Sequence, residues 1–311
     1  MPVYDPSGNV TFTMQDFGAP LAKPNFVGRQ WKNTGDYNVA IRINDLGFRD
    51  ARDVSDAKKN DLVFVGDSFT FGWGVGESER FSNQLDAMLG IRTFNIAVPS
   101  TNFAGYQKLV LYAEERGASI GHLVIGVCME NDLCNYERHA RRSTQHRDAG
   151  FSFGRMFSTT KKGLAAYTST YHALTSFVHR TAFLRKAFIR IGLVKDNFAG
   201  MRTNDFDKAE IISSVNQLVE LSSNYDSTII IIPSRGLWIG DNQRNERLVH
   251  DAFVERLRQH RLTVVDLRPV FEQCGEPLNY HFEYDGHWNP DGHEVAAKTI
   301  ASRLVPFFRD N

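Results

Sequence analysis

The chain has 311 residues, 42% of them hydrophobic, and its 36 basic side chains balance its 36 acidic ones. This composition excludes a largely disordered chain, and the length allows one large domain or two small ones, with a sizeable core. A formal net charge of zero gives no overall field that favours nucleic acid or an anionic membrane surface, so we expect neither as a partner.

Residues 1–57 are predicted to form a β-rich extension. Apolar and polar residues alternate in 37–43 and again in 10–14, which is the period of a half-buried strand. Residues 44–47 carry a turn signal after the longer of these segments. We therefore separate this extension from the rest of the chain, residues 58–311.

From residue 58 onward, short apolar runs alternate with segments of helical spacing. The five runs are 62–65, 93–98, 122–127, 228–232 and 262–267, and helical spacing follows in 81–89, 209–222 and 294–304. Continuously apolar strands are buried on both faces, as in parallel sheets, and the connections are long enough for crossover helices. The pattern predicts a doubly wound three-layer α/β fold with a parallel five-stranded sheet.

Residues 136–205 interrupt this rhythm and contain basic and aromatic side chains but no strong strand run. We expect a helical insertion, with a helical stretch over about 164–191. It either packs over the edge of the sheet with its charges solvated, or forms a lid over a site.

Three cysteines, Cys128, Cys134 and Cys274, are too few and too scattered for a disulfide scaffold or a zinc site. We expect them to be buried free thiols. The N-terminus lacks the pattern of a signal peptide, and no apolar run is long enough to cross a membrane. These features predict a cytoplasmic protein with no integral membrane segment, no metal and no cofactor; they define no oligomeric state.

The first candidate for chemistry is Gly66-Asp67-Ser68, directly after the first apolar run. Sites in open α/β sheets form at the carboxyl ends of strands, where the Ser68 hydroxyl would be exposed. Its backbone N–H, near the start of a helix, would face a developing oxyanion. The competing interpretation is that Ser68 only caps that helix.

The second candidate is Asp285-Gly286-His287-Trp288, before the final helix. A serine hydroxyl needs a base to become a nucleophile, and a carboxylate to orient that base. Asp285 and His287 are two residues apart, so in an extended loop both side chains point the same way. Asp291 or His293 would be substitutes, although residues 289–292 resemble a turn and a helix start.

Two further segments follow strands. Asn131, after the third run, would donate its side-chain amide to an oxyanion, or form an ordinary turn with Asp132. The loop around Ser100, after the second run, would supply a backbone N–H.

Taken in order, these four blocks resemble those of the SGNH (GDSL-type) hydrolases, over roughly residues 61–304 without the insertion. The resemblance implies a flavodoxin-like α/β/α sandwich and a metal-free serine hydrolase acting on esters. It makes Ser68 the nucleophile, His287 the general base and Asp285 its orienting acid. The oxyanion hole would comprise the N–H groups of Ser68 and Ser100 and the Asn131 amide.

Two departures from that family pattern stand out. The family offers a glycine where this chain has Ser100, with Gly105 as another candidate. The acid and base are separated by one residue rather than two, and this Asp-x-His-Trp form is similar to bacterial exopolysaccharide O-acetyltransferases of the alginate type.

The resemblance therefore implies an esterase or deacetylase, acting on short acyl esters, acetyl esters foremost, of a small molecule or a carbohydrate. The alternative is a carbohydrate O-acetyltransferase on the same scaffold. A non-catalytic binding module is the third interpretation, because a fold does not fix a function.

Overall fold

The structure is a computed structural model that describes residues 10–32, 34–133, 177–178, 181–190, 207–260 and 262–309. At its centre is a parallel five-stranded sheet with the order β6-β5-β7-β8-β9. The strands are β5 (Leu62–Val65), β6 (Thr93–Asn95), β7 (His122–Cys128), β8 (Asp226–Ile232) and β9 (Thr263–Asp266). All five predicted runs form these strands, so the predicted α/β fold with a parallel five-stranded sheet is confirmed.

The strand order places a topological switch point between β5 and β7. The chain leaves β5 for β6 on one side and later returns to β7 on the other. In doubly wound sheets, sites form outside the carboxyl ends of the strands at this point. Residues 66–68 follow β5 and residues 129–132 follow β7, so two of the four candidate blocks meet there.

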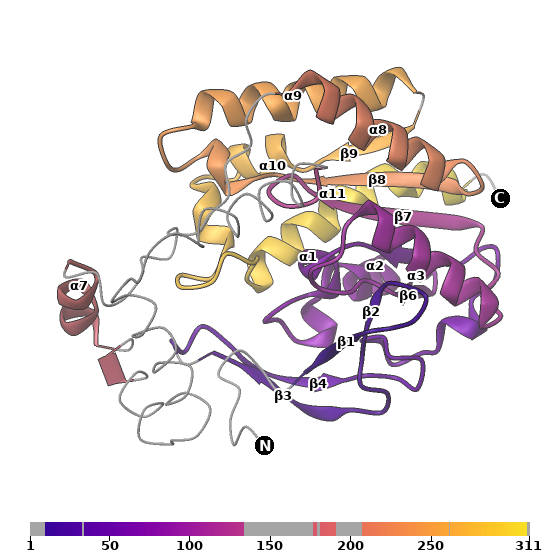
Figure 1. Ribbon diagram of the computed structural model, residues 1–311, viewed down its shortest axis with the longest axis horizontal. Coiled ribbons are helices and arrows are strands. Elements are labelled where there is room, and N and C mark those ends of the chain that lie inside the picture. Colours follow the sequence, from indigo (N-terminus) through magenta and orange to yellow (C-terminus); the bar gives the residue numbers. More distant parts are fainter. Residues whose placement is uncertain are drawn as a thin grey trace, which may run out of the picture.

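Helices cover both faces of the sheet (Figure 1). The described helices are α1 (Ser68–Phe71), α2 (Phe81–Leu89), α3 (Phe103–Glu115), α7 (Ala182–Arg190), α8 (Lys208–Ser222), α9 (Gln243–Gln259), α10 (Arg268–Gln273) and α11 (Pro290–Arg309). Of these, α7 lies apart from the sheet, at the left of Figure 1. Short 3₁₀ turns, η1 (Val54–Asp56), η2 (Glu77–Glu79), η3 (Arg235–Leu237) and η4 (Pro277–Tyr280), join some of them.

The two faces of the sheet bury separate hydrophobic clusters. Val63 and Val65 of β5 point to the cluster that includes residues of α3, α8 and α9. Leu62 and Phe64 point to the opposite cluster, with residues of α2 and α11. Strand side chains alternate between faces, so burial on both sides explains why the strand reads as one continuous apolar run.

The N-terminal segment forms two small antiparallel sheets, as predicted. One pairs β1 (Phe12–Met14) with β2 (Pro20–Ala22), and the other pairs β3 (Val27–Trp31) with β4 (Asn38–Arg42). Leu21 and Phe48 belong to the hydrophobic cluster beneath α3. The extension is therefore packed onto the α/β core, below it in Figure 1.

Most of the predicted insertion, 136–205, lies outside the described residues, and so does Cys134. Within it, the structure describes α7, which falls inside the predicted helical stretch. The expectation of buried thiols is right for Cys128 and wrong for Cys274, which is exposed just beyond the end of α10.

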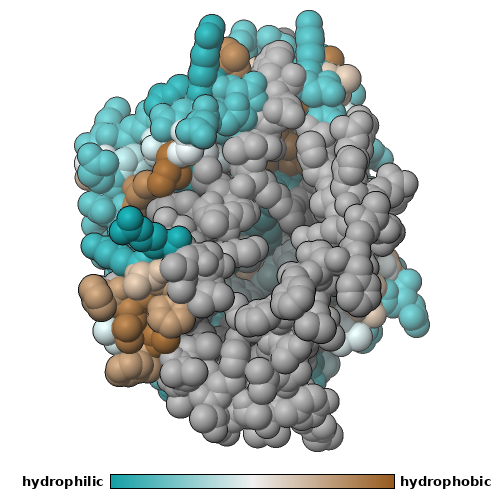
Figure 2. Space-filling model, turned by 60° about the vertical axis from the view of Figure 1, so that its left-hand side comes forward, coloured by the Kyte–Doolittle hydropathy of each residue, from teal (hydrophilic) through white to brown (hydrophobic). Residues whose placement is uncertain are grey.

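Figure 2 shows the face that lies on the left of Figure 1. Hydrophilic side chains cover much of its described surface, and a smaller hydrophobic patch lies at the lower left of the view. Among the described helices, none is long and apolar enough to span a bilayer.

Candidate active site

Ser68 stands at the sharp exit of strand β5 into helix α1. Asp67, and not Ser68, is the helix cap: its Oδ1 accepts a hydrogen bond of 2.9 Å from the Phe69 N–H. The interpretation of Ser68 as a cap is therefore wrong. Ser68 is the first helical residue, where the backbone N–H has no partner within the helix.

Glycine at position 66 is required by the packing of Thr70, one turn into α1. A Cβ at Gly66 would lie 2.2 Å from Thr70 Oγ1, and one at Gly126 of β7 would lie 2.0 Å from the same atom. The Thr70 hydroxyl thus occupies space that side chains on β5 and β7 would fill. This close fit fixes the helix, and with it Ser68, against the carboxyl ends of β5 and β7.

Ser68, His287 and Asp285 form one hydrogen-bonded chain. His287 Nε2 lies 2.8 Å from Ser68 Oγ, and His287 Nδ1 is hydrogen-bonded to Asp285 Oδ1. The His287 N–H also donates to Asp285 Oδ1, at 3.2 Å. Because Nδ1 faces a carboxylate, the proton of a neutral imidazole belongs there, which leaves Nε2 to accept the proton of Ser68.

The second oxygen of Asp285 is held by the N-terminal extension. Lys32 Nζ lies 2.6 Å and Tyr37 Oη 3.1 Å from Asp285 Oδ2. Burial alone would raise the pKa of Asp285, but the neighbouring His287 and Lys32 lower that pKa below its ordinary value. The carboxylate is therefore ionised and held by donors on both of its oxygens.

The loop after β6 places Ser100 beyond the carboxyl ends of the strands, as Ser68 is placed after β5. Parallel pairing continues past the strand, since Val98 N donates to Gly66 O at 3.1 Å. Ser100 has a φ of 62°, in the left-handed region that favours glycine, so this serine adopts the conformation expected of the family's glycine.

Gly105, the other candidate, lies inside helix α3. Its N–H donates at 3.2 Å to the side chain of Asn102, which caps that helix. This N–H is already engaged, so the geometry favours Ser100 as the second oxyanion donor.

Asn131 follows β7 and lies beside the segment that carries Asp67 and Ser68. Its Nδ2 donates to Asp67 Oδ2 at 3.0 Å, and this contact uses one of the two amide hydrogens. Burial raises the pKa of Asp67, while the hydrogen bonds from Asn131 and Phe69 oppose that rise. The side chain of Asn131 is thus fixed beside Ser68 through Asp67, with a second amide hydrogen available.

Arg235, a residue that the sequence interpretation missed, lies against the loop that carries Asp285 and His287. It follows β8, and its guanidinium forms a bidentate pair with Glu130, which follows β7. A Cβ at Gly286 would lie 2.1 Å from Arg235 Nη1, so a larger residue there would displace the guanidinium that pairs with Glu130. The position of Arg235, directly after a buried strand, is the signal that would have identified it.

The two substitutes for the triad lie elsewhere. Asp291 is exposed in the first turn of α11. His293 is 1% exposed and stacks on the Phe81 ring, with its Nδ1 accepting from the Phe81 N–H at 3.4 Å. Neither is in the chain of hydrogen bonds that reaches Ser68.

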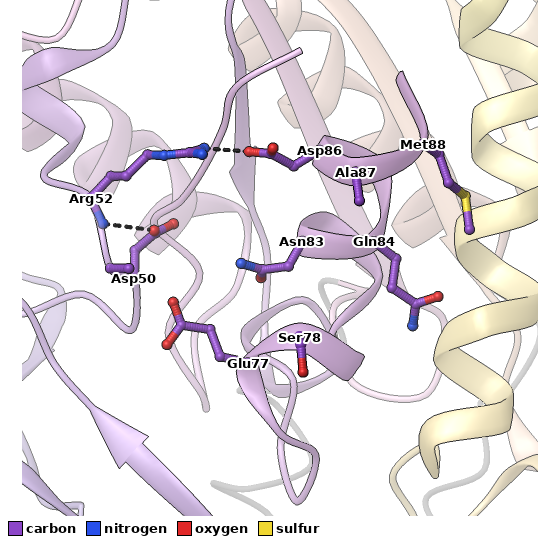
Figure 3. A pocket seen from close by; sticks show the side chains of 10 residues that line it. Asp50, Arg52, Glu77, Ser78, Asn83, Gln84, Asp86, Ala87 and Met88 are labelled. Atoms are coloured by element: carbon purple, nitrogen blue, oxygen red, sulfur yellow. Dashed lines mark hydrogen bonds and ion pairs between the residues drawn. The ribbon is translucent and has the colours of Figure 1, made fainter. Parts of the chain in front are cut away.

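A cavity of about 540 Å³ opens between η2, helix α2 and the loop after β4. Figure 3 shows its polar lining, in which Arg52 pairs with Asp86. No residue of the Ser68–His287–Asp285 chain lines it, so it is separate from this site. Within the described ranges, no group of three or more His, Cys, Asp or Glu side chains is placed to hold a metal ion.

Residues 210–307 match a family model described as the SGNH hydrolase-like domain of the acetyltransferase AlgX. The match runs from α8 into α11 and contains Asp285 and His287, while Ser68 lies before it. It confirms the resemblance to the SGNH hydrolases for this part of the chain. No curated protein matches the chain in sequence.

Solved structures of similar fold include several hydrolases. A member of the lipolytic G-D-S-L family from Veillonella parvula is 12% identical, with a TM-score of 0.45, covering 80% of this chain and 98% of that one. A carbohydrate esterase family 2 enzyme from Corynascus thermopiles (Myceliophthora fergusii) is 13% identical, with a TM-score of 0.42. The match covers 81% of this chain and 67% of that one. A family 3 carbohydrate esterase from Clostridium thermocellum is 9% identical, with a TM-score of 0.42. The match covers 81% of this chain and 98% of that one.

Proposed function

We propose that the protein is a serine-dependent ester hydrolase that acts on short acyl esters, acetyl esters foremost, through an acyl-enzyme on Ser68. The observation that carries this proposal is the hydrogen-bonded chain from Ser68 Oγ through His287 to the ionised Asp285. A serine, a base and an orienting acid in this order are the parts that activate a hydroxyl.

The reaction follows from the protonation states. His287 Nε2 takes the Ser68 proton as Oγ bonds to the ester carbonyl carbon, and the carbonyl oxygen becomes an oxyanion. The N–H groups of Ser68 and Ser100 and the second amide hydrogen of Asn131 receive that charge. His287 then returns the proton to the departing alkoxide as the ester C–O bond breaks, leaving the acyl group on Ser68. Water repeats the sequence and releases the acid.

A second candidate is acyl transfer, in which a carbohydrate hydroxyl replaces water in the second half-reaction. The family model that matches residues 210–307 is that of an acetyltransferase, which favours this candidate. Both candidates share the acyl-enzyme, so they differ only in the acceptor.

The first test is hydrolysis of a p-nitrophenyl ester series, from acetate upward, by wild type and Ser68→Ala. We expect release that falls by about 10³-fold or more in Ser68→Ala, and an acyl adduct on Ser68 by mass spectrometry. Ser78→Ala, at an exposed serine of the separate cavity, is the matched control and should leave the rate unchanged.

The acceptor is identified by adding oligosaccharides to the same reaction. Faster p-nitrophenol release together with an acylated sugar indicates transfer, while free acid alone indicates hydrolysis. Equal release by wild type and Ser68→Ala across the series, with no adduct on Ser68, would contradict both candidates and favour a binding module.

A further inference from the structure

Among the described residues, the carboxylate of Asp285 receives two of its four hydrogen bonds from a hairpin more than 240 residues away in the sequence. Lys32 and Tyr37, between β3 and β4, are 253 and 248 residues from Asp285, and both bind its Oδ2. We propose that this hairpin is part of the catalytic apparatus: Lys32 and Tyr37 are positioning residues that hold Asp285, and the charge of Lys32 weakens the negative potential that Asp285 presents to His287. This inference rests on the proposed function.

Hydrogen bonds connect the two strands of the hairpin to each other and to the loop after α1. The Lys32 N–H donates to Tyr37 O at 3.1 Å, so the two residues pair with each other across the hairpin. Tyr37 Oη accepts from Trp73 Nε1 at 2.9 Å, and Gly74 N donates to Gln30 Oε1 at 2.9 Å. The hairpin is thus bonded to the loop that follows the nucleophile helix.

The same hairpin also binds the catalytic loop beside Asp285. Asp36 Oδ1 accepts from the Tyr284 N–H at 3.1 Å, and the Tyr37 ring packs on Phe282 at 5.1 Å between centroids. Burial and the Asp285 carboxylate raise the pKa of Tyr37, so its hydroxyl keeps its proton and donates. The hairpin therefore joins the nucleophile side of the site to the acid side.

Lys32 differs from Tyr37 because it brings a charge. Its side chain is only 24% exposed, and that of Asp285 only 9%, so solvent screens this pair weakly. The positive charge of Lys32 partly cancels the negative charge of Asp285. The electrostatic potential that would stabilise a protonated His287 is therefore weaker than it would be without Lys32. Replacing Lys32 with a neutral residue should therefore favour the imidazolium form of His287.

Other ionisable groups face the same pair. From the hairpin, Asp36 is within electrostatic reach of Lys32 and Asp285; the remaining groups are Asp67, Arg235 with Glu130, and the buried His281 and His293. Arg235 already binds Glu130 in a bidentate pair. Lys32 is the cation in direct contact with the triad carboxylate, so its removal is the informative change.

The test is a titration of the His287 imidazole, followed by NMR of ¹³C-labelled histidine and assigned by its absence in His287→Gln. Lys32→Met should move the midpoint upward by about 0.5–1 pH unit, and the acid limb of kcat/KM should move with it. Lys32→Arg keeps the charge and should stay near wild type. Lys23→Met, at an exposed lysine of the same extension, is the matched control and should not move it.

An unmoved His287 titration in folded Lys32→Met would overturn the inference, and so would equal shifts in Lys32→Met and Lys23→Met. Lys32→Gln provides a second neutral variant, with far-UV circular dichroism to verify folding of each. The NMR readout needs no turnover. If Ser68-dependent hydrolysis is absent while the titration moves as expected, the proposed function fails and the electrostatic role of Lys32 stands.

Discussion

Asn131 illustrates how one side chain in this site serves both structure and chemistry. Its amide is the hydrogen-bond partner of the buried Asp67 Oδ2, in addition to its proposed place in the oxyanion hole. Asn131→Ala should therefore lower kcat by about 10²–10³-fold. It should also lower the free energy of unfolding by about 1–3 kcal/mol, because a buried carboxylate oxygen loses its partner.

The two effects are separable by measurement. Ester hydrolysis under saturating substrate reports the first, and urea unfolding monitored by tryptophan fluorescence reports the second. Hydrolysis within a few-fold of wild type would remove Asn131 from the oxyanion hole. An unchanged unfolding free energy would contradict its role in holding Asp67.

The candidate residues that the structure brings together are those whose sequence signal is local. Ser68 follows a buried strand, and Asp285 and His287 lie two residues apart, so each signal is readable within one short segment. Lys32 and Tyr37 carry no such signal, because a lysine and a tyrosine near a hairpin turn are ordinary surface residues until the fold brings them to Asp285. Long-range polar contacts of this kind have no periodicity to detect.

At the scale of elements, the loop between α1 and η2 depends on a single buried arginine. Arg49 is 1% exposed, and its guanidinium donates to the carbonyl oxygens of Phe71, Gly72 and Val75, the last at 2.5 Å. Arg80, fully buried beside it, donates to Arg49 O at 2.5 Å. Burial, followed by the charge of Arg80, lowers the pKa of Arg49 to about 9.

Arg49→Met should therefore remove a donor from three backbone carbonyl oxygens, of which that of Gly72 still accepts from the Val75 N–H. We expect the free energy of unfolding to fall by about 3 kcal/mol or more, and activity to fall with it because this loop carries Trp73, the partner of Tyr37. Urea unfolding measures the first effect. Arg29→Met, at an exposed arginine of β3, is the control; an equal loss of stability in both variants would contradict the role of Arg49.

The elements themselves were largely predictable. Strands buried on both faces read as apolar runs, and the helices α2, α8 and α11 appear as repeats of helical spacing. The arginine network could not be predicted, since Arg49 and Arg80 lie in polar segments that resemble solvated loops. Their burial depends on how the N-terminal extension packs against the loop between α1 and η2, and no local sequence pattern specifies that packing.

For the molecule as a whole, two buried histidines should govern stability in mild acid. His281 and His293 are 5% and 1% exposed, and burial, followed by the nearby arginines, lowers the pKa of each to about 3. The unfolded chain takes up these protons near pH 6.5, well before the folded chain does. Stability contributed by the neutral imidazoles is thus present above pH 6.5 and is lost as the pH falls toward 3.

His293→Gln isolates this effect from the carboxylates, because the same carboxylates titrate in both proteins. The stability advantage of wild type over His293→Gln should shrink by about 2–3 kcal/mol between pH 6.5 and pH 4, at about 1.4 kcal/mol per pH unit for one proton. Urea unfolding at pH 7, 6, 5 and 4 measures it, with His260→Gln as the variant that removes an exposed histidine. A difference that stays constant across this range would mean that His293 takes up its proton in the folded protein as readily as in the unfolded chain, and that acid unfolding is driven by other groups.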